Sequence, residues 1–129
     1  MSAVTDTSTE VLRRILVVDD DVDIRETVAE ILRDEGYPVD AVGDGLEALD
    51  YLRTRPSPRL VLLDLMMPGM NGEDLVKVLR ETPTLADTRI AVVSAARDVR
   101  ERAEEMKAVA FLQKPISLER LLALVERHI

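Results

Sequence analysis

The 129-residue chain has no cysteine, no tryptophan, one histidine, two tyrosines and one phenylalanine. Without cysteine, the chain has no disulfide, no thiolate metal site and no cysteine nucleophile. A single histidine, His128, excludes metal sites built from several histidines and argues against a serine–histidine–aspartate triad. The scarcity of aromatic rings argues against a protein that stacks nucleic-acid bases or sugars on aromatic platforms.

Basic charge is also in deficit, because 17 lysines and arginines face 25 aspartates and glutamates, which gives a net charge of −8. Surfaces that bind nucleic acid or anionic lipid need an excess of basic residues, so we expect no direct DNA binding and no membrane association. The apolar runs are far shorter than the roughly 20 residues of a transmembrane helix. The N-terminal segment lacks the basic and apolar regions of a secretion signal, so we expect a cytoplasmic protein.

What the chain does contain is a regular alternation of short apolar runs and longer amphipathic segments. The apolar runs predict buried strands at 15–18, 60–63 and 90–93, whereas 39–42 is a short strand candidate and 109–112 a weaker one. Apolar positions three and four residues apart predict helices over 22–35, 44–53, 73–81, 98–107 and 118–129. The start of the chain is polar and without periodicity, so we expect a flexible tail over 1–12 and one domain over 13–129.

Helix ends and strand order follow from the same pattern. Gly36 fits the residue that ends the first helix, and Asp98 and Ser117 fit N-caps of the last two helices. Strict alternation of apolar strands and helices predicts an α/β protein with a parallel sheet covered by helices on both faces. Right-handed crossovers restrict the topology to a few doubly wound arrangements.

Polar residues follow the predicted strands at the points where they end. They are Asp19, Asp20 and Asp21 after the first strand, Asp64 after the third, Ser94 after the fourth, and Lys114 two residues after the fifth. In the strand order 2-1-3-4-5, the first and third strands are neighbours about 4.8 Å apart at the point where ligands bind in such sheets. The carboxylates of Asp19, Asp20 and Asp64 are therefore expected to crowd together.

Three crowded carboxylates repel one another unless one of them holds a proton or a cation binds. Mg²⁺ suits such a site, because it prefers oxygen ligands and binds through a few carboxylates, waters and a phosphate. Together with the Lys114 ammonium and the Ser94 hydroxyl, these groups can neutralise a phosphoryl group in transfer, with Asp64 as nucleophile. Taken singly, each residue is equally well explained as a helix cap or a turn residue; the combination on one edge is specific.

At this point the chain resembles a known family. The segments 15–21 (ILVVDDD), 62–72 (LLDLMMPGMNG) and 93–95 (VSA), with Lys114 and Pro115, resemble the response-regulator receiver domain of two-component signalling. The resemblance implies a flavodoxin-like, doubly wound (βα)5 fold with a five-stranded parallel sheet in the order 2-1-3-4-5. It also implies that Asp64 is the phospho-acceptor, and that Mg²⁺ is held by Asp20 and Asp64, by Asp19 through a water, and by the backbone carbonyl of Met66.

The same resemblance gives roles to the remaining residues. Ser94 looks like the switch hydroxyl that moves to the phosphoryl group, and Phe111 like the aromatic residue that turns inward when Ser94 moves. Lys114 would contact a phosphoryl oxygen, and its peptide bond to Pro115 is expected to be cis. Many members carry threonine at the Ser94 position and tyrosine at the Phe111 position, so an output that needs a tyrosine hydroxyl is not available here.

The function implied is phosphorelay signalling. A sensor histidine kinase or histidine phosphotransfer protein would phosphorylate Asp64 in a Mg²⁺-dependent reaction, docking near Ile24 and the loop at Lys114. Hydrolysis of its own aspartyl phosphate is compatible with this function, but no turnover of a separate substrate is expected. The face formed by 98–107, 109–112 and 118–129 would control an unidentified protein partner, with the chain a monomer or a weak homodimer through this face.

Three alternatives are weighed against this reading. A small Mg²⁺-dependent phosphohydrolase would want an acid or base two residues after the nucleophile, where Met66 stands. A receiver-like module that is never phosphorylated usually loses an acidic residue or the lysine, and all are present here. A nucleotide or flavin binder would want a glycine-rich loop after the first strand, not three carboxylates. The sequence leaves open whether the chain acts alone or within a longer protein.

Overall fold

The computed structural model describes residues 13–129, so the tail predicted over 1–12 lies outside the described residues. Strands and helices alternate along this range: β1 (Ile15–Val18), α2 (Val22–Asp34), β2 (Val39–Val42), α3 (Gly45–Thr54), β3 (Leu60–Asp64), α4 (Gly72–Glu81), β4 (Ile90–Ser94), α5 (Val99–Glu105), β5 (Ala110–Gln113) and α6 (Leu118–His128). All strand pairs are parallel, in the order β2-β1-β3-β4-β5. The predicted doubly wound fold is confirmed. None of the helices in this range is both long and apolar enough to span a membrane.

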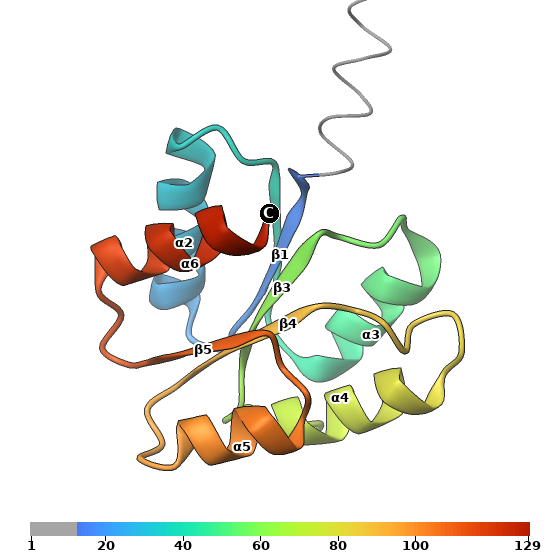
Figure 1. Ribbon diagram of the computed structural model, residues 1–129. Coiled ribbons are helices and arrows are strands. Elements are labelled where there is room, and N and C mark those ends of the chain that lie inside the picture. The colour runs from blue at the N-terminus through green and yellow to red at the C-terminus, as the bar shows by residue number, and fades with distance from the viewer. Residues whose placement is uncertain (1–12) are drawn as a thin grey trace, which may run out of the picture.

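The sheet is buried between two helical layers, which explains why its strands are continuous apolar runs. Figure 1 shows α2 and α6 on one face of the sheet and α3, α4 and α5 on the other. Alternate side chains of β1 point to opposite faces: Ile15 and Val17 pack in the cluster with α2 and α6, and Leu16 and Val18 in the cluster with the other three helices. Burial on both faces of β1, β3 and β4 leaves only the ends of these strands for polar side chains.

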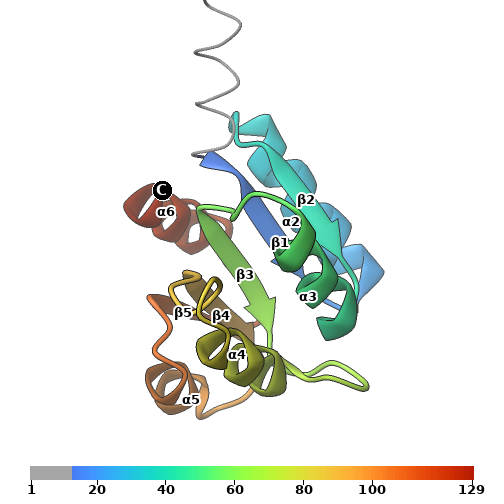
Figure 2. The ribbon, with the colours of Figure 1, turned by 90° about the vertical axis from the view of Figure 1, so that its right-hand side faces the viewer.

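The strand register brings three of these ends to one edge. Val18 of β1 pairs with Leu63 of β3, and Asp64 pairs with Val93 of β4. In Figure 2 the β3 arrow points toward the loop that leads into α4. The residues that follow β1, β3 and β4 therefore share the carboxyl edge of the sheet.

The helix ends follow the sequence with one correction. Gly36 has φ 94° after the end of α2, and the Ser117 hydroxyl accepts the Arg120 N–H at the start of α6, both as predicted. Asp98 precedes α5, which spans 99–105 rather than 98–107, but its side chain makes no capping hydrogen bond. Its backbone (φ −94°, ψ 27°) is not extended like that of an N-cap, and its carboxylate lies 3.8 Å from Arg102 Nη1 instead.

The end of α5 places a residue with a side chain in left-handed backbone. Lys107 has φ 57°, and the N–H groups of Lys107 and Ala108 return to the carbonyls of Glu104 and Ala103. This closing pattern normally uses glycine, because a Cβ is crowded at positive φ. Arg80 of α4 donates to the Lys107 carbonyl at 3.3 Å, which ties the turn to the neighbouring helix.

Replacing Lys107 by glycine is therefore expected to stabilise the domain. Left-handed backbone costs a residue with a Cβ about 1–2 kcal/mol, and the greater backbone entropy lost by glycine offsets about half of that, so the free energy of unfolding should rise by about 0.5–1 kcal/mol. Urea denaturation measures the difference. The matched control is Lys107→Ala, which removes the ammonium group but keeps the Cβ; a gain in Lys107→Gly no larger than in this control would contradict the explanation.

Candidate functional site

Three carboxylates converge at the carboxyl edge of the sheet, as the sequence predicts. One oxygen from each of Asp19, Asp20 and Asp64 can be chosen so that all three lie within 4.8 Å of one another. Asp19 and Asp64 are buried, with exposed fractions of 4% and 5%, whereas Asp20 is exposed to solvent. The cluster is therefore a half-covered acidic site that solutes can enter from the Asp20 side.

The three consecutive aspartates after β1 do different things. Asp21 is the N-cap of α2, and its carboxylate accepts the N–H groups of Asp23 and Ile24. The Asp19 side chain turns inward, where its Oδ1 accepts the Asp21 N–H at 2.9 Å. Of the three aspartates, Asp21 alone caps the helix. Asp19 and Asp20 remain available to the acidic cluster.

Asp64 is held at the end of β3 by its own backbone and by the start of α4. Its Oδ1 accepts the Met66 N–H at 3.1 Å. Gly72, the first residue of α4, packs so close that a Cβ there would lie 2.7 Å from the Asp64 carbonyl oxygen. Only glycine allows this approach, which places the N-terminal end of α4 directly beside the acidic cluster.

Lys114 provides the positive charge of the site. Its ammonium Nζ lies 2.9 Å from Asp19 Oδ2 and 3.6 Å from Asp64 Oδ2. The Lys114 backbone N–H donates to the Ser94 carbonyl at 2.8 Å, so the end of β4 holds the loop that carries the lysine. The peptide bond between Lys114 and Pro115 is cis.

Ser94 and Phe111 lie in positions of opposite exposure. Ser94 is fully buried, and its Oγ accepts the Ala96 N–H at 3.1 Å. Phe111 belongs to β5, where it pairs in register with Val92 of β4, and 41% of its surface is exposed. The structure thus holds the serine hydroxyl inside and the single phenylalanine ring partly outside.

The electrostatics of the cluster show an unbalanced negative charge. Burial, and secondarily the charges of Asp19 and Asp20, raise the pKa of Asp64 to about 6, although the Met66 N–H and Lys114 act in the opposite direction. Burial alone would lower the pKa of Lys114, but its hydrogen bond to Asp19 and the charge of Asp64 outweigh it, and the pKa is raised. One ammonium group does not compensate three carboxylates.

The donor set fits Mg²⁺. Oxygens that share one Mg²⁺ at about 2.1 Å lie up to about 4.2 Å apart, close to the spacing found here, and the exposed side of Asp20 leaves room for waters and an anionic oxygen. All three ligands are hard carboxylate oxygens, with no nitrogen or sulfur that would favour zinc or copper. A divalent cation would also supply the missing positive charge.

Comparison with known proteins agrees with this geometry. The family model for the response regulator receiver domain matches residues 15–126. This chain belongs to the response-regulator receiver family. Receiver domains are signalling modules of two-component systems rather than enzymes that turn over a separate substrate.

Relatives and solved structures place the receiver domain more closely. It is 43% identical over 112 residues to the response regulator MprA of Mycobacterium sp. strain KMS, covering 85% of this chain and 47% of that protein. It is 39% identical over 121 residues to the DNA-binding response regulator MtrA of Mycobacterium tuberculosis H37Rv, covering 91% and 50%. The chain thus spans about half the length of these relatives.

Two solved structures superpose over nearly their whole length. The chemotaxis response regulator CheY4 of Vibrio cholerae has a TM-score of 0.82 at 29% identity, covering 92% of this chain and 99% of that chain. The response regulator TrrA of Thermotoga maritima, in complex with Mg²⁺-BeF, has a TM-score of 0.80 at 32% identity, covering 91% and 99%. The receiver fold is therefore shown by both sequence and structure.

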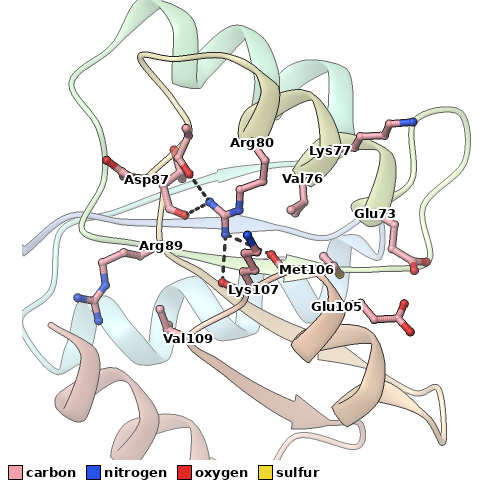
Figure 3. Close-up of a pocket in the computed structure, with 12 residues that line it drawn as sticks. Glu73, Val76, Lys77, Arg80, Asp87, Arg89, Glu105, Met106, Lys107 and Val109 are labelled. Atoms are coloured by element: carbon pink, nitrogen blue, oxygen red, sulfur yellow. Dashed lines mark hydrogen bonds between the residues drawn. The ribbon is translucent and has the colours of Figure 1, made fainter.

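A cavity lies between α4 and the end of α5, away from the acidic cluster. It measures about 690 Å³, and Figure 3 shows the Arg80 side chain pointing into it from α4. The Arg80 guanidinium donates to the carbonyls of Ala86, Thr88, Met106 and Lys107. These hydrogen bonds join α4 to two neighbouring turns, so this hollow has a structural explanation and no converging ligand chemistry.

One residue beside the site is missing from the sequence-based set. Arg25, in the first turn of α2, donates through Nη1 to the Asp19 carbonyl at 2.9 Å. A signal for it exists in the sequence, because Arg25 stands three, four and seven residues before the buried residues Val28, Ala29 and Leu32. This spacing predicts that Arg25 lies on the side of the helix that faces the sheet.

The raised pKa of Asp64 predicts that Asp64→Asn stabilises the receiver in the absence of metal. The folded state binds the Asp64 proton more tightly than the unfolded chain, so stability falls as the pH rises from 3.8 through 6. Each pKa unit corresponds to about 1.4 kcal/mol, so Asp64→Asn should raise the free energy of unfolding at neutral pH by about 2–3 kcal/mol. The measurement is urea denaturation with EDTA.

The gain should shrink as the pH is lowered from 6 toward 3.8, where Asp64 becomes protonated in both states. The matched control is Asp74→Asn, an exposed carboxylate in the first turn of α4. A gain in the free energy of unfolding that does not change with pH, or an equal gain in the control, would show that the charged Asp64 carboxylate does not destabilise the fold.

Proposed function

We propose that this receiver domain accepts a phosphoryl group on Asp64 from the phosphohistidine of a sensor histidine kinase or a histidine phosphotransfer protein. The observation that carries the proposal is the position of the Asp64 carboxylate. It is buried, lies beside the Lys114 ammonium, and shares one cation-sized space with Asp19 and Asp20. Aspartate in such a setting is an established type of phosphoryl-accepting nucleophile.

The transfer exchanges one bond to phosphorus for another. A carboxylate oxygen of Asp64 attacks the phosphorus in line, the new O–P bond forms, and the N–P bond of the phosphohistidine breaks. The electron pair of the broken bond stays on the imidazole nitrogen, which then takes up a proton. Lys114, 3.6 Å from Asp64, is placed to pair with a phosphoryl oxygen and offset the charge that gathers there.

In this proposal Mg²⁺ would be held by Asp20 and Asp64, by the backbone carbonyl of Met66, and by Asp19 through a water. The ion would supply positive charge to the phosphoryl oxygens. The chain's own residues supply the other roles: Asp64 attacks, Lys114 orients the phosphoryl group, and the Asp21 N–H and the Lys114 ammonium hold the Asp19 carboxylate in place.

Phosphorylation would be read out through Ser94 and Phe111. The Ser94 hydroxyl exchanges its bond from the Ala96 N–H for one to the phosphoryl group, which vacates space inside the sheet edge. The half-exposed Phe111 ring turns into that space, and the face made of α5, β5 and α6 changes shape. This face would contact a downstream protein partner, or a second copy in a weak homodimer.

Kinase docking is proposed at an apolar groove beside Lys114. The groove measures about 340 Å³ and lies between α2 and the turn from β5 into α6. Ile24 and Ile31 line it from α2, and Pro115, Ile116 and Leu118 line it from the turn and the start of α6. An apolar helix of a partner seated here would bring its histidine to the open side of the acidic cluster.

The role of any larger protein is also a proposal. The relative MtrA is named as a DNA-binding response regulator, and this chain spans about half of it. The net charge of −8 argues against DNA contact by the chain itself. We propose residues 13–129 as the receiver and protein–protein contact as its means of output.

Phosphorylation can be tested with radiolabelled acetyl phosphate, which needs no partner. With Mg²⁺, the wild-type chain should gain label as a hydroxylamine-sensitive acyl phosphate, and Asp64→Asn should gain none. Lys114→Ala should slow labelling by about 100-fold, because a preorganised charge beside the transferring group is lost. EDTA should abolish labelling in the wild type.

Asp74→Asn serves as the control, because it removes an exposed carboxylate from α4 without touching the cluster. Equal labelling of Asp64→Asn and the wild type would disprove the choice of Asp64. Labelling that is unaffected by EDTA would disprove the role of the divalent cation.

The switch can be followed at Phe111, because the chain contains one phenylalanine. Ring-fluorinated phenylalanine would give a single ¹⁹F resonance, which should shift when Mg²⁺ and beryllofluoride are added together and the ring leaves solvent. Ser94→Ala should lose most of this shift, and Ser94→Thr should keep it. An unchanged resonance in a protein that labels normally on Asp64 would show that Phe111 takes no part in the response.

A further inference from the structure

We infer that Arg25 is a positioning residue of the acidic site, which fixes the turn after β1 so that Asp19 and Asp20 face Asp64. The inference rests on the function proposed above and adds a residue to it. Arg25 touches no reacting atom in that proposal. Its guanidinium Nη1 donates to the Asp19 carbonyl oxygen at 2.9 Å, and it acts through this backbone contact.

The carbonyl that Arg25 holds belongs to the peptide unit that joins Asp19 to Asp20. Because a peptide unit is planar, a fixed carbonyl also fixes the direction in which the next Cα leaves it. Asp20 is exposed, so packing does little to orient its side chain. The Arg25 hydrogen bond therefore fixes the backbone position from which the Asp20 side chain projects.

Asp19 is the most constrained residue of the site. Its N–H donates to the Val42 carbonyl at 3.3 Å, its Oδ1 accepts the Asp21 N–H, and its Oδ2 accepts from Lys114. Arg25 completes the set at the carbonyl oxygen. Different elements thus hold the side chain and the backbone of Asp19. Loss of the Arg25 contact would free the Asp19 carbonyl and leave the side-chain contacts in place.

The charge of Arg25 is placed beside the cluster without occupying it. In the part of the chain that the structure describes, the cluster's ion pairs are those of Lys114 with Asp19 and Asp64, and Arg25 forms none. An arginine paired directly with Asp20 would compete with a cation for the carboxylate oxygens. By bonding to a carbonyl instead, Arg25 holds the loop and leaves these oxygens available.

Gly43, in the turn after β2, provides the space that the Arg25 guanidinium occupies. A Cβ at position 43 would lie 2.9 Å from Arg25 Nη1 and 3.6 Å from its Cζ. The Gly43 N–H donates to the Glu47 carboxylate at 2.7 Å, which anchors the turn to α3. Gly43→Ala is therefore expected to push the guanidinium off the Asp19 carbonyl while leaving the arginine in the chain.

Isothermal titration of the metal-free full chain with Mg²⁺ tests the role. Arg25→Met should bind Mg²⁺ about tenfold more weakly, as is typical when a residue that orients a metal ligand without touching the metal is lost. Arg25→Lys keeps a donor of similar reach and should recover most of the affinity. The matched control is Arg33→Met, which removes a similar hydrogen bond (2.8 Å, to the Val39 carbonyl) two turns further along α2 and should bind like the wild type.

A double-mutant cycle separates positioning from general destabilisation. Gly43→Ala should weaken Mg²⁺ binding in the wild-type background but cause no further loss in Arg25→Met, because the contact is already gone. Wild-type affinity in Arg25→Met, equal losses in Arg25→Met and Arg33→Met, or additive losses in the cycle would overturn the role.

A second readout needs no metal. Hydrogen exchange of the Asp21 amide, which Asp19 Oδ1 accepts, should quicken in Arg25→Met and not in Arg33→Met, as measured by NMR in EDTA. Equal exchange in the two variants would overturn the positioning role. Failure of the wild type to bind Mg²⁺ would count against the proposed function alone, because this measurement still decides the role of Arg25.

Discussion

The contact of the Lys114 ammonium with two buried carboxylates is the constraint on which the rest of the site depends. It joins the end of β5 to the ends of β1 and β3, and so crosses the central strands of the sheet at their carboxyl edge. One ammonium group offsets only part of the charge of three aspartates, and the charges of Asp19 and Asp20 add to the larger effect of burial in raising the pKa of Asp64. Asp64 therefore holds a proton more tightly than an ordinary aspartate, and a divalent cation would relieve the same repulsion.

The scaffold tolerates this excess of negative charge because its stability comes from other parts of the fold. Both faces of the sheet are covered by apolar clusters, so the strands are held rigidly without help from their polar ends. Asp64 sits at the end of a strand that is buried throughout, and Gly72 lets α4 approach its carbonyl. The repulsion is thus concentrated in a few side chains on a stiff frame, where a ligand can relieve it.

The fold was largely predictable because burial on both faces leaves a strong pattern in the sequence. Each of the five strands was expected within one or two residues of its position, and the residues brought together at the sheet edge were those that follow the strands. The direction of individual polar side chains could not be predicted from the sequence. Asp98 has the identity of an N-cap, but its carboxylate lies near Arg102, whose guanidinium also contacts Glu73 of α4.

Arg25 illustrates the same limit at the site. Its spacing from Val28, Ala29 and Leu32 marks it as facing inward, but its partner is a backbone carbonyl, which every residue possesses. No residue type in the sequence signals such an acceptor. The exposed fraction of Phe111 could not be predicted either, because alternation along a short edge strand does not show how much of a large ring neighbouring residues cover.

The hydrogen bonds of Arg80 anchor the C-terminal end of α5 to α4 through the carbonyls of Met106 and Lys107. At the other end Asp98 makes no capping hydrogen bond, and Arg102 within the helix bonds to Glu73 of α4. In the proposed switch, a change at Ser94 would reach α5 through the short 95–98 segment, while the Arg80 hydrogen bonds hold the opposite end of the helix in place.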